Sequence, residues 1–258
     1  MKKGWWQVPE HLPKVNTVSN EIPILCHGVL PEMTPYVPRA IYQTWESHDM
    51  PVRMSSAAAE LRAANPGFAY HLFDAIERRT FLVENFSAEV VDAYDTLVPN
   101  AFKADLWRYC VLYLRGGIYV DMKFVPVNGF SFASLMDKQY WVLDYKHTFP
   151  GVNHGIYNAF LMSAPGNPIF LSVIRQLVKN VQGRIVGEKS LDITGPGLLG
   201  GLMSRDACNL YWDRKRIVHV DTHEPILIEY DGYREDCKNV GSVHYSELWP
   251  DKVYTVQK

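Results

Sequence analysis

The chain has 258 residues, of which 47% are hydrophobic and 21% are charged, and its formal net charge is −2. This length and composition can bury the core of one large domain and exclude a disordered chain. Because nucleic acid is held mainly by Lys and Arg against phosphate, a net charge of −2 argues against nucleic acid as a partner.

The four cysteines are spaced widely and irregularly, at Cys26, Cys110, Cys208 and Cys237. A zinc site or a disulfide framework would need closer, patterned spacing, so we expect reduced thiols in a cytosol-like compartment. No apolar stretch of signal-peptide length follows the first residues, and no segment approaches the about 18 apolar residues of a membrane span. The sequence therefore predicts a soluble, cytoplasmic protein without a membrane span.

The first 37 residues are rich in Pro and polar residues and predict an irregular arm that packs on a single domain, residues 38–258. Helices here are bounded by Pro and Gly, which break helices. In chain order, the first elements predicted are a strand at 38–45, a helix at 51–64, a strand at 68–73 and a helical stretch at 75–97.

The strongest local pattern lies between residues 101 and 124. Residues 101–114 contain no Gly or Pro, and apolar residues recur at helical spacing. Gly116 and Gly117 then end the helix, and β-forming residues at 118–121 predict a strand. Alternating strands and helices predict an α/β fold with a mostly parallel sheet flanked by helices.

The second half of the chain is richer in loops. A strand is predicted at 140–145 and an amphipathic helix at 168–182, which begins at Pro168, a favoured first helical position. A loop at 194–197 and two strands, at 216–220 and 225–230, complete the prediction.

Two charged residues of the 101–114 helix lie three apart on the face opposite its apolar arc. Asp105 and Arg108 are therefore neighbours, and alone they would form a surface ion pair worth under about 1 kcal/mol. The next strand ends at Asp121, however, and ligands of open α/β sheets bind at the carboxyl ends of strands. Asp121 could bind a divalent cation or ribose hydroxyls, or could be an ordinary turn residue.

Taken together, Ala104–Tyr109 (ADLWRY) and Gly116–Asp121 (GGIYVD) resemble glycosyltransferase family 32. This family has a DxD sugar-binding region and includes Golgi mannosyltransferases and relatives of the glucosylating domains of bacterial toxins. Residues 38–45 are similar to its opening strand, and 194–196 to its TGP loop. The resemblance runs from about residue 38 to 250 and is nearest to short soluble viral or microbial members of the family. A viral member would work in the cytoplasm of the host cell.

The resemblance implies a GT-A fold with a Rossmann-like sheet, and transfer of a sugar from a nucleotide-sugar donor with retention of configuration. UDP-sugars are favoured as donors, and GDP-mannose stays open; the acceptor is a hydroxyl of a glycan, a glycoprotein or another molecule. By position, Asp105 and Arg108 would grip hydroxyls of the donor sugar. Asp121 would reach ribose, sugar or metal, and Asn158 would lie near the reacting sugar.

Other positions are assigned to donor binding by the same resemblance. Tyr42, Gln43 and Thr44 would line the nucleotide pocket, although Tyr42 stands where the family usually has His. His244 and Trp249, weak signals by themselves, match the closing segment of the family and would cover the diphosphate.

The motif itself departs from the family. Asp121-Met122-Lys123 has Lys where Asp-x-Asp has its second acid, and an ammonium cannot ligate a metal. Either Asp121 and His244 hold the implied Mn²⁺ or Mg²⁺ with fewer protein ligands, or Lys123 partly replaces its charge in donor binding. Of the two, we favour retained metal dependence.

Two other functions compete with sugar transfer. A glycoside hydrolase would use two facing carboxylates, for which Asp105 and Asp121 could serve, and would ignore nucleotides. A non-catalytic nucleotide-sugar or glycan binder is favoured by Lys123. A dehydrogenase is not favoured, because no GxGxxG follows a strand.

Overall fold

The structure is a computed structural model that describes residues 24–26, 31, 34, 36–144, 154–241 and 243–256. Most of the predicted arm, residues 1–37, and the last predicted residue of the strand at 140–145 lie outside the described residues. The helices among the described residues are too short or too polar to cross a membrane.

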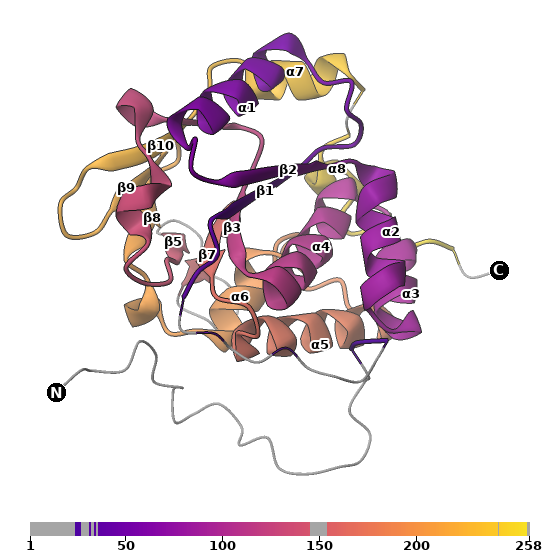
Figure 1. Cartoon of the computed structure of the whole chain (residues 1–258). Helices are drawn as coiled ribbons and strands as arrows, with labels where there is room; N and C mark the ends of the chain where they lie inside the picture. Colours follow the sequence, from indigo (N-terminus) through magenta and orange to yellow (C-terminus); the bar gives the residue numbers. More distant parts are fainter. Residues whose placement is uncertain are drawn as a thin grey trace, which may run out of the picture.

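A four-stranded sheet of order β2-β1-β3-β7 forms the centre of the domain (Figure 1). Strands β1 (Ala40–Thr44), β2 (Ala69–Phe73) and β3 (Gly117–Val120) are parallel, and β7 (Phe160–Ser163) runs antiparallel to β3. Helix α1 (Val52–Ala64) connects β1 to β2 as the sequence predicts. This parallel part is the Rossmann-like half of the fold.

Helices cover one face of this sheet. They are α2 (Ala75–Asn85), α3 (Ala88–Thr96), α4 (Asn100–Arg115) and α5 (Pro168–Gln182), whose buried side chains share one apolar cluster with Tyr42 and Tyr119 of the sheet. The single helical stretch predicted at 75–97 is thus two helices. Asp74 begins the first with a reciprocal capping box to Glu77, and Phe86 and Ser87 take extended conformations between the two.

The opposite face packs against a second sheet of order β4-β10-β9-β8-β5-β6. Its strands are β4 (Phe124–Pro126), β5 (Val142–Asp144), β6 (Gly155–Ile156), β8 (Leu210–Trp212), β9 (Arg216–His219) and β10 (Pro225–Glu229). Only β5 and β8 are parallel here. The expectation of a mostly parallel sheet is therefore correct for the first sheet and wrong for the second, because short turns join antiparallel strands.

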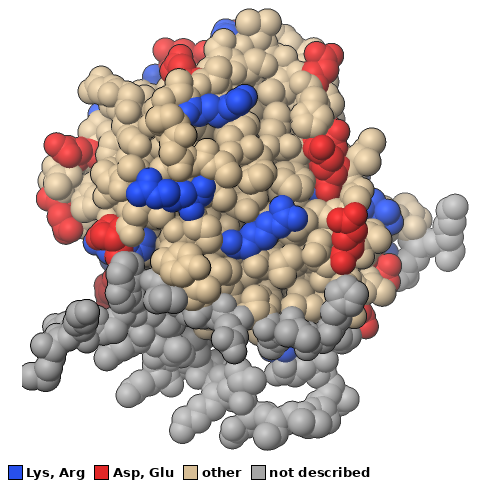
Figure 2. Space-filling view, viewed as in Figure 1, with Lys and Arg blue, Asp and Glu red and all other residues tan. Residues whose placement is uncertain are grey.

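The remaining helices are short. They are η1 (Val127–Gly129), η2 (Phe132–Leu135), α6 (Pro196–Leu202), η3 (Arg205–Ala207), α7 (Tyr233–Asn239) and α8 (Tyr245–Leu248). Helix α7 lies beside α1 at the edge of the domain (Figure 1). In Figure 2, Lys and Arg side chains stand apart among uncharged atoms, and Asp and Glu lie around the rim of the view, so charge on this face is mixed.

Helix α4 is the most enclosed helix of the cluster that covers the sheet. Eleven of its side chains are buried, including those of Asp105 and Arg108. The sequence puts Asp105 and Arg108 on the face opposite the apolar arc, and the structure shows that this face is enclosed too, because α2, α3, α5 and β3 all contact α4. Its charged residues therefore lie inside the protein rather than on a solvated surface.

The turn between α4 and β3 depends on two glycines. Gly116 has φ 63° and Gly117 has φ 103°, backbone conformations that residues with a side chain rarely adopt. A Cβ on Gly116 would lie 2.5 Å from Pro165 Cδ, and one on Gly117 would lie 2.7 Å from the carbonyl oxygen of Ala40. The turn fixes where β3 begins, and so where Asp121 lies.

We predict that Gly116→Ala lowers the free energy of unfolding by about 2–5 kcal/mol, because left-handed strain adds to overpacking. Gly129 is a matched control, since it has φ 71° and no atom within 4 Å of the position that a Cβ would take. Gly129→Ala should cost only about 1–2 kcal/mol for the backbone conformation. Urea denaturation measures both, and equal losses would contradict the packing explanation.

Candidate active site

Four predicted residues converge at the carboxyl end of β3. Asp121 directly follows this strand, Asp105 and Arg108 come from α4, and Asn158 lies in the turn before β7. The main-chain N–H of Asp121 donates to the carbonyl of Ala159 over 2.8 Å, which ties the two strand ends together. The strand order thus brings side chains from three separate segments to one point.

The guanidinium of Arg108 is the centre of this group. Its Nη2 lies 3.1 Å from Asp105 Oδ1, and its Nη1 lies 3.3 Å from Asp121 Oδ1. Nη1 also donates to the main-chain carbonyl of Asn158 over 2.7 Å. The side chain is only 6% exposed and packs 4.3 Å from the ring centroid of Tyr119. One buried cation therefore pairs with both carboxylates.

Asp105 is held from its other side as well. Its Oδ1 accepts from Asn158 Nδ2 over 2.8 Å, and its Oδ2 accepts from the Thr194 hydroxyl over 2.7 Å. Tyr109 joins the network, because its hydroxyl accepts from Asn158 and donates to the Thr194 carbonyl. Burial raises the pKa of the Asp105 carboxyl, while Arg108 and the Thr194 hydrogen bond act in the opposite direction.

Asp121 is the exposed end of the network, with 21% of its side chain accessible. Its Oδ1 accepts from the Tyr119 hydroxyl over 2.7 Å, and its Oδ2 lies 3.3 Å from the ammonium of Lys123. Its main-chain carbonyl accepts from Gln43 Nε2 over 3.3 Å. A ligand that approaches the strand end meets Asp121 before it meets Asp105 or Arg108.

Lys123 lies within a box of aromatic rings. Its Nζ is 5.2 Å from the ring centroid of Tyr157, 5.5 Å from Phe124, 5.9 Å from Trp212 and 6.0 Å from Tyr233. Tyr157 and Trp212 stack with centroids 4.7 Å apart. The rings come from β4, β8, α7 and the segment after β6, so the second sheet builds this part of the site.

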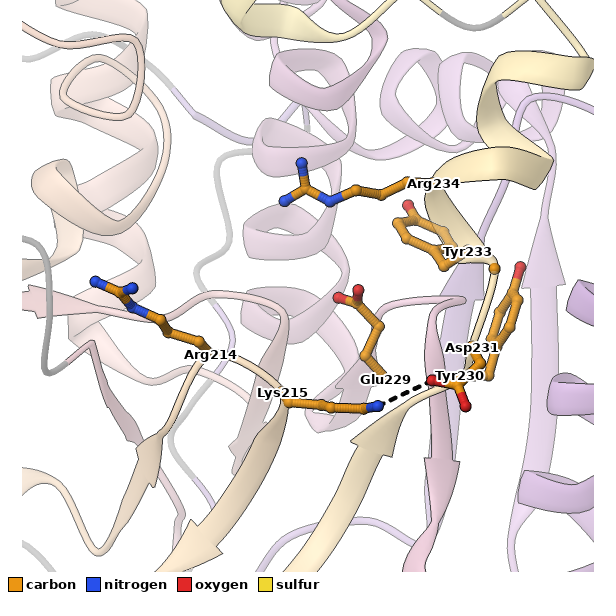
Figure 3. A pocket seen from close by; sticks show the side chains of 8 residues that line it. Arg214, Lys215, Glu229, Tyr230, Asp231, Tyr233 and Arg234 are labelled. Carbon is orange, nitrogen blue, oxygen red and sulfur yellow. Dashed lines mark hydrogen bonds and ion pairs between the residues drawn. The ribbon is translucent and has the colours of Figure 1, made fainter.

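A cavity of about 270 Å³ adjoins the aromatic box, and Tyr233 lines it. Figure 3 shows Arg214 and Arg234 entering it from different segments, with Glu229 between them. Lys215 pairs with Asp231 at its floor, 2.9 Å apart. Polar and charged side chains thus surround a hollow next to Lys123.

The three residues predicted to line a nucleotide pocket alternate across β1. Gln43 faces Asp121 and accepts from the Tyr70 hydroxyl, whereas Tyr42 and Thr44 face the helices. The Tyr42 ring is buried and stacks on His71. The Thr44 hydroxyl donates to the Phe73 carbonyl over 2.7 Å and accepts from Arg78 over 3.0 Å. Gln43 is therefore the member of this group that the structure joins to Asp121.

The two residues predicted from the chain end contact other partners. His244 caps α8, and its Nδ1 pairs with the Ser246 hydroxyl over 2.7 Å. Trp249 Nε1 donates to the carbonyl of Val186 over 2.7 Å. Across the described residues, neither side chain has a hydrogen bond or ion pair to the Arg108 network, and their donor-binding role stays a prediction.

Residues that could ligate a cation are grouped elsewhere. In the described part of the chain, one set of three His, Cys, Asp or Glu side chains has ligand atoms within 4.8 Å of one another, namely His48, Asp74 and Glu77. Asp74 and Glu77 already form the capping box of α2. The predicted metal pair, Asp121 and His244, belongs to no such three-ligand set there.

Several residues of the site were not predicted as such from the sequence. Tyr119 could have been found, because it lies two residues before Asp121 on the same face of a strand. Thr194 matched a family loop, but spacing does not show that it bonds to Asp105. Tyr157, Trp212 and Tyr233 approach Lys123 from segments that are distant in the chain. The sequence around Lys123 carries no pattern that predicts these contacts.

Comparison with known proteins agrees with this geometry. Residues 51–145 match the family model described as a glycosyltransferase sugar-binding region containing a DXD motif. This stretch of the chain is therefore similar to the sugar-binding region of that glycosyltransferase family. The matched region contains α4, β3 and the Asp121-Met122-Lys123 segment, which form the core of the site.

Individual relatives extend the comparison. The chain is 30% identical over 166 residues to inositol phosphoceramide mannosyltransferase 3 of Schizosaccharomyces pombe, across 64% of this chain and 42% of that protein. It is 27% identical over 143 residues to an uncharacterised glycosyltransferase of Acanthamoeba polyphaga mimivirus, across 55% of each. The chain thus spans less than two thirds of the length of these relatives.

The fold is also similar to a solved structure, the PaToxG glycosyltransferase, with a TM-score of 0.50 and 16% sequence identity. The match covers 66% of this chain and 70% of that one. At this identity the likeness bears on the fold alone, and it confirms the predicted α/β fold of GT-A type.

We predict that Arg108→Met lowers the free energy of unfolding by about 3–5 kcal/mol, because it leaves two carboxylates without their shared cation. Adding Asp105→Asn should restore part of the loss, with a coupling of about 0.5–3 kcal/mol. Arg79→Met, which removes an exposed pair with Asp95, should leave stability nearly unchanged. Denaturant unfolding measures all three, and additive losses would argue against one network.

Proposed function

We propose that the chain is a glycosyltransferase that moves a sugar from a nucleotide-sugar donor to an acceptor hydroxyl, with retention of configuration. One observation carries the proposal: Arg108 joins Asp105 and Asp121 in a buried network that opens to solvent at Asp121, beside an ammonium. The match of residues 51–145 to the glycosyltransferase family model supports the same reaction.

The exposed members of the network define how it would act. Asp121 would contact the donor, because one fifth of its side chain is accessible, whereas Asp105 and Arg108 are each less than one tenth exposed. We therefore assign Asp105, Arg108 and Asn158 to positioning Asp121 rather than to direct contact. Rigid support of this kind keeps a catalytic group in its productive geometry.

The chemistry requires stabilisation of the diphosphate that leaves. The transition state is oxocarbenium-like, as in glycoside hydrolysis, and negative charge grows on the departing phosphate. Lys123, next to Asp121, is the cation that would stabilise this negative charge. Both carboxylate oxygens of Asp121 already have partners within the protein, the Tyr119 hydroxyl and the Lys123 ammonium. We therefore favour attack by the acceptor on the same face of the sugar that the diphosphate leaves, rather than a covalent intermediate on Asp121.

A glycoside hydrolase is less well supported. Its two carboxylates must stand apart, with the scissile bond between them and one of them protonated. Here the guanidinium of Arg108 lies between Asp105 and Asp121 and contacts both. A sugar cannot occupy the same position while the pair is intact.

Donor and acceptor are inferred from chemistry and relatives. The S. pombe relative is named a mannosyltransferase, which supports GDP-mannose beside the UDP-sugars as a candidate donor. The acceptor would be a hydroxyl of a glycan or glycoprotein. The four cysteines are free thiols, which supports work in a reducing, cytosol-like compartment.

The DXD motif of the family implies a divalent cation, Mn²⁺ or Mg²⁺, at the diphosphate. The residues around Asp121 do not fit one, because the second acid is Lys123 and the first is already paired with two cations. We therefore derive no step through a metal.

We predict that Asp121→Asn lowers transfer by about 100-fold or more, since the variant loses the charge facing the donor. Asp95→Asn, which neutralises an exposed carboxylate far along α3, is the matched control and should retain activity. Product formation from UDP- and GDP-sugars measures turnover, and circular dichroism checks the fold. Near-normal turnover of Asp121→Asn would contradict the proposal.

We also predict that UDP or GDP, alone or as a nucleotide sugar, raises the melting temperature of the chain, because a ligand that binds only the folded state stabilises it. A non-catalytic binder would show the same shift without turnover, which separates it from a transferase. A hydrolase would show neither nucleotide binding nor nucleotide-dependent turnover.

A further inference from the structure

Charge balance distinguishes this site from one built on Asp-x-Asp. Asp105 and Asp121 carry two negative charges, and Arg108 and Lys123 carry two positive charges, so the cluster is neutral. With Asp in place of Lys123, the same four positions would carry a net charge of −2. A divalent cation would then restore neutrality, and Lys123 achieves the same balance without one.

Ligand chemistry points in the same direction. Divalent cations of this type take six or more oxygen ligands, preferably with carboxylates among them. Asp121 has both oxygens engaged, by Tyr119 and Arg108 on one side and by Lys123 on the other. A cation beside this carboxylate would also be repelled by the ammonium and the guanidinium, at distances where such repulsion is strong in a partly buried site.

The aromatic box holds the ammonium in place. Four ring centroids lie within 6.0 Å of Lys123 Nζ, and the side chain is 15% exposed. Burial alone would lower the pKa of Lys123, but Tyr157, Asp121 and Tyr233 outweigh it and hold the pKa above its usual value. Ring faces attract cations, so the box stabilises a charged group at this point.

We propose that Lys123 takes the place of the divalent cation and that this chain binds the diphosphate of a nucleotide-sugar donor without metal. The inference rests on the proposed function. An ammonium has three N–H donors. Among the described residues, the ion pair of Lys123 is with Asp121, which leaves N–H donors for a phosphate oxygen.

The transfer step balances without a metal. The bond between the anomeric carbon and the phosphate oxygen breaks, and its electron pair stays on the phosphate, next to Lys123. The acceptor oxygen forms the new bond to the anomeric carbon, and its proton passes to the departing phosphate. Lys123 stays protonated throughout and supplies electrostatic stabilisation.

Binding of UDP and GDP to the full chain tests the inference by calorimetry, in EDTA and in Mn²⁺. We expect the affinity to differ by less than about twofold between the two conditions. Electron paramagnetic resonance of Mn²⁺ gives a readout independent of activity, and the wild-type chain should leave the free-ion signal unchanged.

Two variants sharpen the test. Lys123→Asp should create Mn²⁺ binding and make nucleotide affinity at least about tenfold stronger with Mn²⁺ than with EDTA. Lys123→Met should weaken nucleotide binding at least about tenfold in both conditions. Lys138→Asp, the same charge reversal at an exposed site beside Asp137, is the control and should behave as wild type.

Wild-type binding that disappears in EDTA and returns with Mn²⁺ would overturn the inference and leave the proposed transferase intact. Lys123→Met with unchanged affinity would also overturn it, whether or not Lys123→Asp folds. Absence of nucleotide binding in every condition would overturn the proposed function itself, and the inference with it.

Discussion

The contacts of one buried guanidinium determine the arrangement of this site. Arg108 carries its charge inside α4, where the cost of removing it from water is high unless partners compensate. Asp105, Asp121 and the carbonyl of Asn158 provide that compensation, and each comes from a different part of the chain. Helix α4, the end of β3 and the turn before β7 must therefore be correctly placed together, so folding and site assembly are one event.

The two sheets contribute different parts of the site. The first sheet and its helices hold the carboxylates, and the second sheet with α7 surrounds Lys123 with rings. The boundary between them falls between Asp121 and Lys123, whose side chains are 3.3 Å apart. The negative and positive halves of the site thus depend on separate packing units, joined by a turn of three residues.

The sequence was most informative where the pattern is local. The helix at 101–114, the strand at 118–121 and the helix at 168–182 appear as α4, β3 and α5, because each has continuous periodicity and clear end signals. The proximity of Asp105, Arg108 and Asp121 followed from helix spacing and strand direction. The resemblance added Asn158, which periodicity alone would have missed.

The features that the sequence did not predict depend on contacts between residues that are far apart in the chain. The burial of α4 depends in part on α5, which lies more than fifty residues later in the chain. The second sheet was missed as a sheet because its strands are two to five residues long and pair across large gaps. The surroundings of Lys123 are set by Tyr157, Trp212 and Tyr233, none of which is near it in the chain.

The fixed start of β3 has an evolutionary consequence. Tyr119 and Asp121 share one face of an extended segment, and Gly116 and Gly117 fix its start against Pro165 and Ala40. Since side chains alternate along such a segment, one inserted or deleted residue would turn the acid to the opposite face. Gains and losses of chain length in descendants of this gene should therefore accumulate in the hairpins of the second sheet, while the interval from Arg108 to Asp121 keeps a constant length.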